Sequence, residues 1–219
     1  MKLTTILTAC SSVIATAFLA VSCVKETGKE VALEQYDYSS KAFVQVYNGT
    51  LNSARNHIYV DAARVTGTPL AYAATFPATP SLFSITAGYR AFLIQDTLIT
   101  TTQPQMSFAE NLQQTANYTI FMYDTLTSPK QKIVVNNIII PADTTARVRF
   151  ANFIFSRTAV PNVDIFSLKR NANVFTNVAV TDVTGYIPYA SALTDTLYVR
   201  ETGTSNLLAT MNGFNPVKN

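Results

Sequence analysis

Side chains that could act as catalytic bases or nucleophiles are scarce in this sequence. Its one histidine, His57, stands in the stretch Arg55–Tyr59, where a loop is predicted to enter a strand. A serine–histidine–aspartate site needs a base hydrogen-bonded to a nucleophile and oriented by a third group. No Gly-x-Ser-x-Gly turn occurs in the sequence. We therefore expect His57 to be a surface or strand-edge residue and not a catalytic base.

The acidic residues are spread singly along the chain. Paired carboxylates can cleave glycosides and clustered ones can hold Ca²⁺, but no Asp-x-Asp-x-Asp-Gly loop occurs. Asp61 and Asp164 fall near equivalent positions of a repeat described below, and we expect each to bond backbone amides at a turn or strand end. With 7 glycines and no phosphate-binding glycine motif, the sequence predicts no enzymatic activity, no metal site and no cofactor.

The dipeptide Asp-Thr recurs four times. It is similar to the Asp-Ser/Thr-apolar acceptor of an O-glycosylation system found on some bacterial envelope proteins, where exposed Thr carries bulky, solubilising sugar. The alternative is that Asp-Thr opens or closes strands in a Thr-rich protein. The candidate O-glycosylation sites are Thr97, Thr125, Thr144 and Thr196.

The N-terminus is typical of a secretory signal. Met1 and Lys2 precede an apolar run from Leu3 to Val21, and a basic start followed by an apolar stretch and small residues makes such a signal. A permanent transmembrane helix is the alternative, but the Thr and Ser residues in the run would make it a weak one.

A lipid anchor is predicted where the apolar run ends. Leu19-Ala20-Val21-Ser22-Cys23 resembles a bacterial lipobox, in which the Cys is acylated and becomes the new N-terminus. Leu7-Thr8-Ala9-Cys10 fits the pattern better but leaves too few residues before Cys10. Two or three acyl chains on Cys23 would anchor the protein stably in a membrane. A plain signal peptide cut near Ser22 remains the alternative.

The predicted mature chain has 197 residues, because 22 of the 219 are removed, and its one Cys carries lipid. It therefore has no disulfide and no thiolate nucleophile. The formal net charge of +3 falls to +2 without Lys2, which is too small for a nucleic-acid-binding protein. The tether Lys25–Glu30 has charges of both signs, which leaves open whether this outer-membrane lipoprotein faces the periplasm or the cell exterior.

Short apolar runs between turn residues predict an all-β protein. Hydrophobic residues make up 48% and charged residues 13% of the chain, which excludes a disordered protein, and no helical periodicity persists beyond about two turns. Strands spaced by 8–12 residues indicate sandwiches. The predicted strands are Ala42–Tyr47, Ile58–Val60, Tyr89–Ile94, Tyr118–Tyr123 and Ile133–Ile140.

A self-comparison indicates an internal duplication. Ala42–Asn48 aligns with Ala146–Asn152 at an offset of 104 residues, Ile58–Asp61 aligns with Val163–Phe166, and Tyr89–Ile94 matches Thr196–Arg200 in pattern. Three matches in the same order favour duplication over chance.

The second copy resembles a bacterial extracellular domain family of unknown function, DUF four-three-nine-seven. The residues that carry the resemblance are Ala146–Asn152, Pro161–Phe166 and Gly185–Pro188, with Tyr118–Phe121 in the first copy. The first copy has Asn56–Tyr59 where the family has a Pro-x-x-Val-Asp strand. The resemblance implies tandem immunoglobulin-like or transthyretin-like antiparallel β-sandwiches on lipoproteins, and no known activity.

The second copy is about 30 residues shorter than the first, and the missing part corresponds to the last two strands. Three explanations remain open. The sequence is part of a longer chain, the Ile133–Ile140 run serves the second sandwich, or an open groove accepts a strand from another chain.

We therefore expect a signal peptide (residues 1–22), a tether (23–40), a first β-sandwich domain (41–143) and a second, incomplete one (144–219). The leading hypothesis is a lipid-anchored cell-envelope binding or structural module without catalytic activity, with an envelope protein or glycan as partner. The alternatives are a subunit of a surface appendage or uptake complex joined by strand addition, and a glycan-active enzyme.

Overall fold

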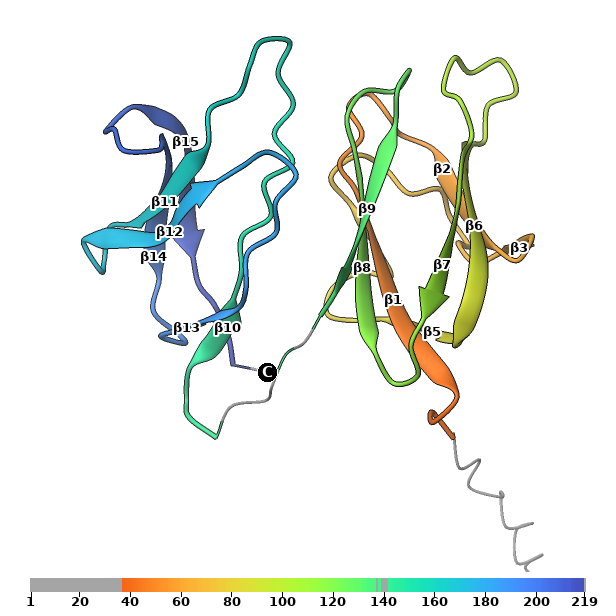
Figure 1. Ribbon diagram of the computed structural model, residues 1–219, viewed down its shortest axis with the longest axis horizontal. Helices are drawn as coiled ribbons and strands as arrows, with labels where there is room; N and C mark the ends of the chain where they lie inside the picture. The colour runs from red at the N-terminus through yellow and green to blue at the C-terminus, as the bar shows by residue number, and fades with distance from the viewer. Residues whose placement is uncertain (1–36, 137, 139–141, 219) are drawn as a thin grey trace, which may run out of the picture. The chain divides into compact units, whose positions relative to one another are not determined.

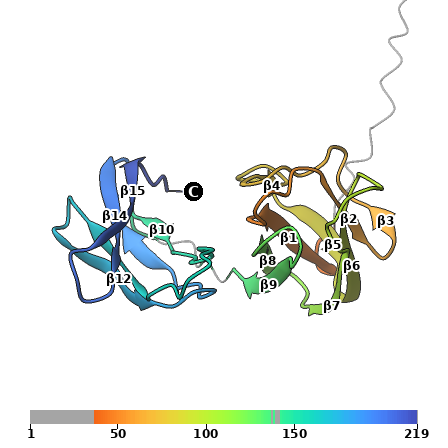
Figure 2. The same ribbon diagram turned by 90° about the horizontal axis from the view of Figure 1, so that it is seen from above.

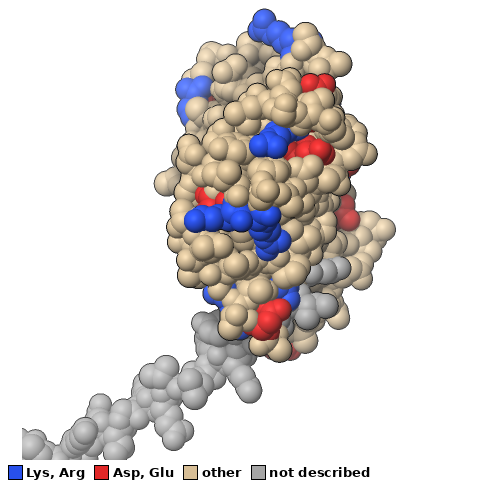
Figure 3. Space-filling view, turned by 90° about the vertical axis from the view of Figure 1, so that its left-hand side faces the viewer, with Lys and Arg blue, Asp and Glu red and all other residues tan. Residues whose placement is uncertain are grey.

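The computed structural model describes residues 37–136, 138 and 142–218 (Figure 1). The described residues form strands and no helix, so none of them makes a helix able to cross a membrane. The all-β, sandwich-like prediction is thereby confirmed. The signal segment and Cys23 lie outside the described residues. Charged side chains are few on the face drawn in Figure 3, and both signs mix there, in keeping with the low charged content.

The first lobe, residues 38–135, is built from two sheets. One sheet has the order β4-β1-β8-β9, with β5 also paired to β1, and the other has the order β3-β2-β6-β7. Figure 2 shows the two sets of strands as facing layers. The strands are β1 (Lys41–Asn48), β2 (Asn56–Val60), β3 (Ala63–Arg64), β4 (Thr75–Phe76), β5 (Phe83–Thr86), β6 (Gly88–Asp96), β7 (Met106–Leu112), β8 (Asn117–Tyr123) and β9 (Lys130–Val135).

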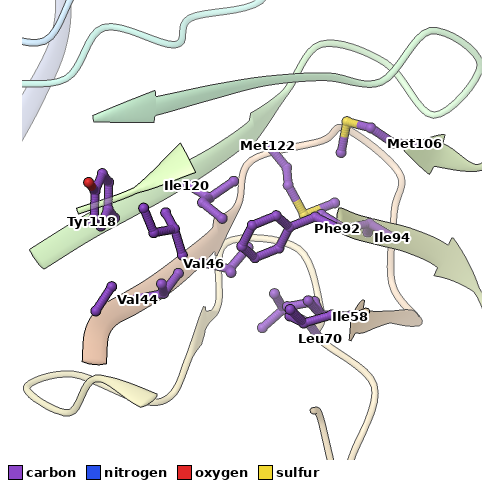
Figure 4. Close-up of a cluster of buried hydrophobic side chains, with 13 residues drawn as sticks. Val44, Val46, Ile58, Leu70, Phe92, Ile94, Met106, Tyr118, Ile120 and Met122 are labelled. Carbon is purple, nitrogen blue, oxygen red and sulfur yellow. The ribbon is translucent and has the colours of Figure 1, made fainter. Parts of the chain in front are cut away.

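Buried and partly exposed residues alternate strictly along β1, which explains why one face of this strand packs on the core. Ala42, Val44 and Val46 are fully buried, while the residues between them are partly exposed, as expected for a strand with one face on the core. Side chains of β8 meet those of β6 across the sandwich, with Ile120 and Met122 next to Phe92 (Figure 4).

The second lobe, residues 142–218, has its own hydrophobic cluster, around Val163, Ile165, Tyr189 and Leu197. Its larger sheet has the order β12-β11-β14-β15, and a two-stranded sheet pairs β10 with β13. The strands are β10 (Ala146–Val148), β11 (Val163–Ser167), β12 (Ala172–Val178), β13 (Ile187–Tyr189), β14 (Asp195–Glu201) and β15 (Leu207–Phe214).

The duplication predicted from the sequence reappears in the strand registers. Ala42 is paired with Ile85, and Ala146 with Tyr189, so both partners are displaced by the same 104 residues. The four-stranded sheets of the two lobes, β3-β2-β6-β7 and β12-β11-β14-β15, also correspond in strand order.

The two asparagines at equivalent positions of the repeat, Asn48 and Asn152, make similar contacts. Both are fully buried. The side-chain oxygen of each accepts the N–H of the second residue onward, at Thr50 and Ile154, over 3.2 and 3.4 Å. The repeated Asn therefore has the same local role in both lobes, which is to bond the backbone of the segment that follows it.

Two features of the first lobe differ from the sequence prediction. The strand expected over Ile133–Ile140 runs from Lys130 to Val135 and pairs with β8, so these residues serve the first lobe and not the second. The β1–β8 pair is parallel, whereas every other described strand pair is antiparallel. Parallel pairing joins segments far apart in the sequence, so local patterns do not reveal it.

Candidate functional site

A groove of about 660 Å³ lies on the first lobe, over the sheet that contains β2 and β6. We call it the β2–β6 groove. Strands β2, β3 and β6 and the loop between β6 and β7 supply its walls. The lining residues are His57, Tyr59, Arg64, Gln95, Asp96, Thr97, Leu98, Ile99, Thr101, Gln103 and Gln105.

Alternation along β2 sends two side chains into the groove. Ile58 and Val60 point into the core, so His57 and Tyr59 point to the opposite face of the sheet. Their rings meet edge to face, with centroids 6.4 Å apart. Gln95 of β6 lies directly opposite His57, which adds an amide to the same face.

His57 is held as a neutral ring below the groove. It is 9% exposed, and its Nδ1 lies 2.9 Å from the hydroxyl of buried Thr66. That hydroxyl also accepts the Ile58 N–H at 3.2 Å, so Thr66 ties the ring to the backbone of β2. Burial, helped by the charge of Arg64, lowers the pKa of His57. The sequence prediction of a surface or strand-edge His57 is therefore wrong, because the residue is buried, pairs with Gln95 of β6 and holds its ring against Thr66.

Asp96 shapes the loop that closes one end of the groove. Its carboxylate accepts the Leu98 N–H at 2.8 Å and the Thr101 hydroxyl at 3.0 Å, and Arg55 forms an ion pair with it at 3.3 Å. Burial pushes the pKa of Asp96 up, but these hydrogen bonds outweigh it and hold the pKa below its ordinary value. The carboxylate is thus occupied in folding the loop and offers little to a ligand.

Amide side chains dominate the remaining lining. Gln105 donates to Gln95 at 2.7 Å, and Gln103, which is 6% exposed, donates to Asn56 at 2.7 Å. The Gln103 side-chain oxygen is buried and has no hydrogen-bond partner among the described residues. A buried acceptor without a partner costs roughly 1–3 kcal/mol.

The rim adds apolar surface to this polar floor. Leu98 and Ile99 lie at the tip of the loop, and Ile99 is fully exposed. The groove therefore combines a mostly polar lining with a smaller aromatic and apolar surface from Tyr59, Leu98 and Ile99. This groove was not predicted from the sequence. The available signal was the alternation of His57 and Tyr59 on β2, together with a Gln-rich loop that also carries exposed apolar residues.

The Asp-Thr candidates for O-glycosylation are scattered over the surface. Thr97 and Thr144 are exposed, whereas Thr125 and Thr196 are partly buried. Each Asp of these dipeptides accepts a backbone N–H one or two residues onward, at Leu98, Thr125, Thr145 and Thr196 respectively. The dipeptide therefore has a structural role at strand and loop ends, and Thr97 is the one candidate that lines the β2–β6 groove.

Asp61 and Asp164 both bond backbone amides, as the sequence analysis expected. Asp61 is exposed and accepts the Ala91 N–H at 3.0 Å and Arg90 at 2.8 Å. Asp164 is buried and accepts the N–H groups of Asn177 and Gly203 at 2.8 and 3.2 Å. Within the described residues, no three His, Cys, Asp or Glu side chains gather where they could hold a metal ion.

Comparison with known proteins adds no identification. No protein-family model matches the chain, and no curated protein matches its sequence. The resemblance to the extracellular domain family thus rests on the sequence motifs alone.

Proposed function

We propose that this protein is a lipid-anchored cell-envelope module that binds an uncharged, hydroxyl-rich ligand, a segment of a glycan, in the β2–β6 groove and does not transform it. The observation that carries the proposal is the lining of the groove, where Gln side chains surround neutral His57 and the ring of Tyr59. Amides both donate and accept hydrogen bonds, as sugar hydroxyls require. An aromatic ring can pack against the apolar face of a sugar.

The charges of the groove favour a neutral ligand. Asp96 is saturated by its loop and by Arg55, and His57 is neutral because its pKa is lowered. Arg64 is the one cationic side chain in the lining. A strongly anionic ligand would find a single exposed partner, and a cationic one would find no free carboxylate in the described lining.

Binding without catalysis is supported by the surroundings of His57. The nearest hydroxyl, that of Thr66, is 2% exposed and lies below the groove floor, where a substrate cannot reach it. General acid–base or nucleophilic work needs a group within reach of the reacting atom. Hydrolysis of any oligosaccharide by the purified protein would overturn this part of the proposal.

The ligand is tested with a panel of neutral linear oligosaccharides of glucose, mannose and galactose, titrated into the isotopically labelled protein. We expect a member of the panel to shift the amide signals of Gln95, Gln103 and Gln105. Tyr59→Ala should weaken that binding at least about tenfold, which corresponds to 1.4 kcal/mol. Tyr89→Ala is the matched control, because Tyr89 is 78% exposed and does not line the groove.

Two results would contradict the groove assignment. One is equal binding by the Tyr59→Ala and Tyr89→Ala proteins, provided both melt at the temperature of the wild type. The other is a response from acidic sugars alone that disappears in Arg64→Gln, which would identify an anion site instead.

The anchor is a separate part of the proposal. It rests on the sequence of the first 23 residues, with acyl chains on Cys23 placing the module at the outer membrane. Metabolic labelling with an acyl-chain probe should mark the wild-type protein and the Cys10→Ala variant. Loss of the label in Cys23→Ala would support the anchor, and a label that persists in Cys23→Ala would contradict it.

A further inference from the structure

Strand β10 has one paired edge and one open edge. The backbone groups of Phe150 face the β13 side, where its carbonyl accepts the Thr184 N–H and its own N–H donates to the Thr184 hydroxyl. Because hydrogen-bonding direction alternates along a strand, Ala146 and Val148 face the same side. The backbone groups of Arg147, Arg149 and Ala151 then face away from β13, and no hydrogen bond from a described residue reaches them.

The first lobe shows what occupies this edge in the other copy. The equivalents of Arg147, Arg149 and Ala151, displaced by 104 residues, are Phe43, Gln45 and Tyr47, and all three are paired with β8. Strand β8 also carries Tyr118, Ile120 and Met122 into the core. No described strand of the second lobe takes the place of β8.

The core side of the second lobe is correspondingly less covered. Val44 and Val46 are fully buried in the first lobe, whereas their equivalents Val148 and Phe150 are partly exposed. Across the sandwich, Met211 of β15 lies opposite buried Leu197 and thus on the core side of its sheet, yet it is 48% exposed. An apolar strip therefore lies beside a row of unpaired backbone groups.

We propose that the open edge of β10 accepts an extended strand of a second protein chain, laid parallel to β10 in the place that β8 takes in the first lobe. Unpaired backbone groups template an added strand, and pockets for alternate side chains select its sequence. Three features of the partner follow from β8. Its N-terminal end lies at Arg147, its inward side chains are large and apolar at every second position, and its length is about seven residues.

The outward side of the partner strand faces two cations. Arg147 in β10 and Arg149 just after it occupy outward-facing positions. In β1 the equivalent positions are those of Phe43 and Gln45. Arg147 has one carboxylate neighbour, Asp143, at 3.2 Å, and Arg149 stacks over the Tyr186 ring at 4.8 Å. Opposite charges on neighbouring strands are stabilising, so the partner carries polar or acidic residues, and not basic ones, at its outward positions.

The test uses a synthetic peptide with the sequence of residues 116–124, the β8 segment of this chain, added to the whole labelled protein. We expect shifted amide signals at Arg147, Arg149 and Ala151 and unchanged signals at Phe43, Gln45 and Tyr47. A nitroxide on the N-terminus of the peptide should broaden signals near Arg147 more than those near Asn152. A control peptide with Ile120→Asp and Met122→Asp should bind at least about tenfold more weakly.

A pair of protein variants separates backbone pairing from side-chain contact. Arg149→Ala keeps the N–H, whereas Arg149→Pro removes it, so only the proline variant should lose peptide binding. Equal binding by the two variants, peptide shifts confined to the first lobe, or broadening centred on Asn152 would each overturn the proposal. Amide groups of Arg147 and Arg149 already protected before peptide is added would do so as well, because the edge would then be covered by this chain itself.

Discussion

The two lobes are built on one strand order but bury different polar groups. The first lobe buries a network of neutral side chains, in which Asn48 and Asn56 bond Ser53 and Gln103 bonds Asn56, together with the carboxylate of Asp96, whose side chain is 4% exposed. The second lobe buries the carboxylates of Asp164 and Asp195. Neutral amides keep their hydrogen bonds at any ordinary pH, whereas a buried carboxylate stabilises a fold only while it is ionised. Both lobes should therefore lose stability in acid, and the second lobe, which buries Asp164 and Asp195, should lose more than the first, which buries Asp96.

The lobes also differ in how the sheet that contains β1, or its equivalent β10, is completed. In the first lobe β8 and β9 close the sandwich over β6 and β7. In the second lobe the equivalent of β1 has a partner on one edge among the described residues. Among the described residues, β8 therefore covers the edge of β1 while the equivalent edge of β10 stays open. The opposite, four-stranded sheet has the same strand order in both lobes.

The largest effect is expected at the carboxylate network of the second lobe. Asp195 accepts hydrogen bonds from Ser167 and Tyr189 and from the N–H groups of Lys169 and Thr196. Asp195→Ala would leave these buried donors unpaired and should cost roughly 3 kcal/mol of unfolding free energy, measured by urea denaturation. Asp143→Ala is the control, because Asp143 has a similarly low pKa, about 2, but is exposed. A similar loss in both variants would contradict the role given to burial.

A matched pair of valines measures the difference in closure. Val44 and Val148 are equivalent positions, but the first is fully buried and the second is partly exposed. Val44→Ala should cost about 2–3 kcal/mol, and Val148→Ala no more than about half as much, because less apolar area is lost from the second lobe. Unfolding curves of the two variants give the comparison. Equal losses would show that the second lobe is as tightly closed as the first.

Acid should lower the unfolding free energy of the second lobe by protonating Asp195. Burial pushes its pKa up, but the hydrogen bonds that it accepts win and lower its pKa to about 2. Its stabilisation is therefore complete above the ordinary pKa of about 3.9 and is lost as the pH falls through about 2. The wild-type protein should lose unfolding free energy between pH 4 and pH 2, and Asp195→Asn should lose less over the same interval. Parallel pH profiles for the two proteins would refute this assignment.

The smallest effect is expected from His57 in the first lobe. Its lowered pKa means that the unfolded chain binds a proton more readily than the folded one. First-lobe stability should therefore decrease slightly as the pH falls below about 6.5, the ordinary pKa of His. Amide exchange of β2 at pH 7 and pH 5 measures this decrease, which should vanish in His57→Gln. A β2 that becomes more protected at pH 5 would reverse the sign and reject the prediction.

Much of the fold could be predicted because its signals are local. Alternation places Ala42, Val44 and Val46 on one face of a strand, and the offset of 104 residues foretells that β10 repeats the register of β1. The parallel β1–β8 pair has no local signal, since its strands are some 70 residues apart in the chain.

The candidate site was hidden for the same physical reason. His57 looks like an edge residue when only its neighbours in the sequence are considered, but it is buried through contacts with Thr66 and β6, which are distant in the sequence. The groove joins residues from three strands and one loop. The Asp-Thr dipeptides were visible in the sequence, but the backbone hydrogen bonds of their Asp residues were not.

Amide hydrogen exchange of the protein alone tests the difference between the lobes most directly. Phe43, Gln45 and Tyr47 of β1 are compared with their equivalents Arg147, Arg149 and Ala151 in and beyond β10. The account predicts strong protection in the first set, because β8 accepts or supplies those hydrogen bonds, and exchange at least about 100-fold faster in the second set. Equal protection of the two sets would contradict it, since the edge of β10 would then not be open.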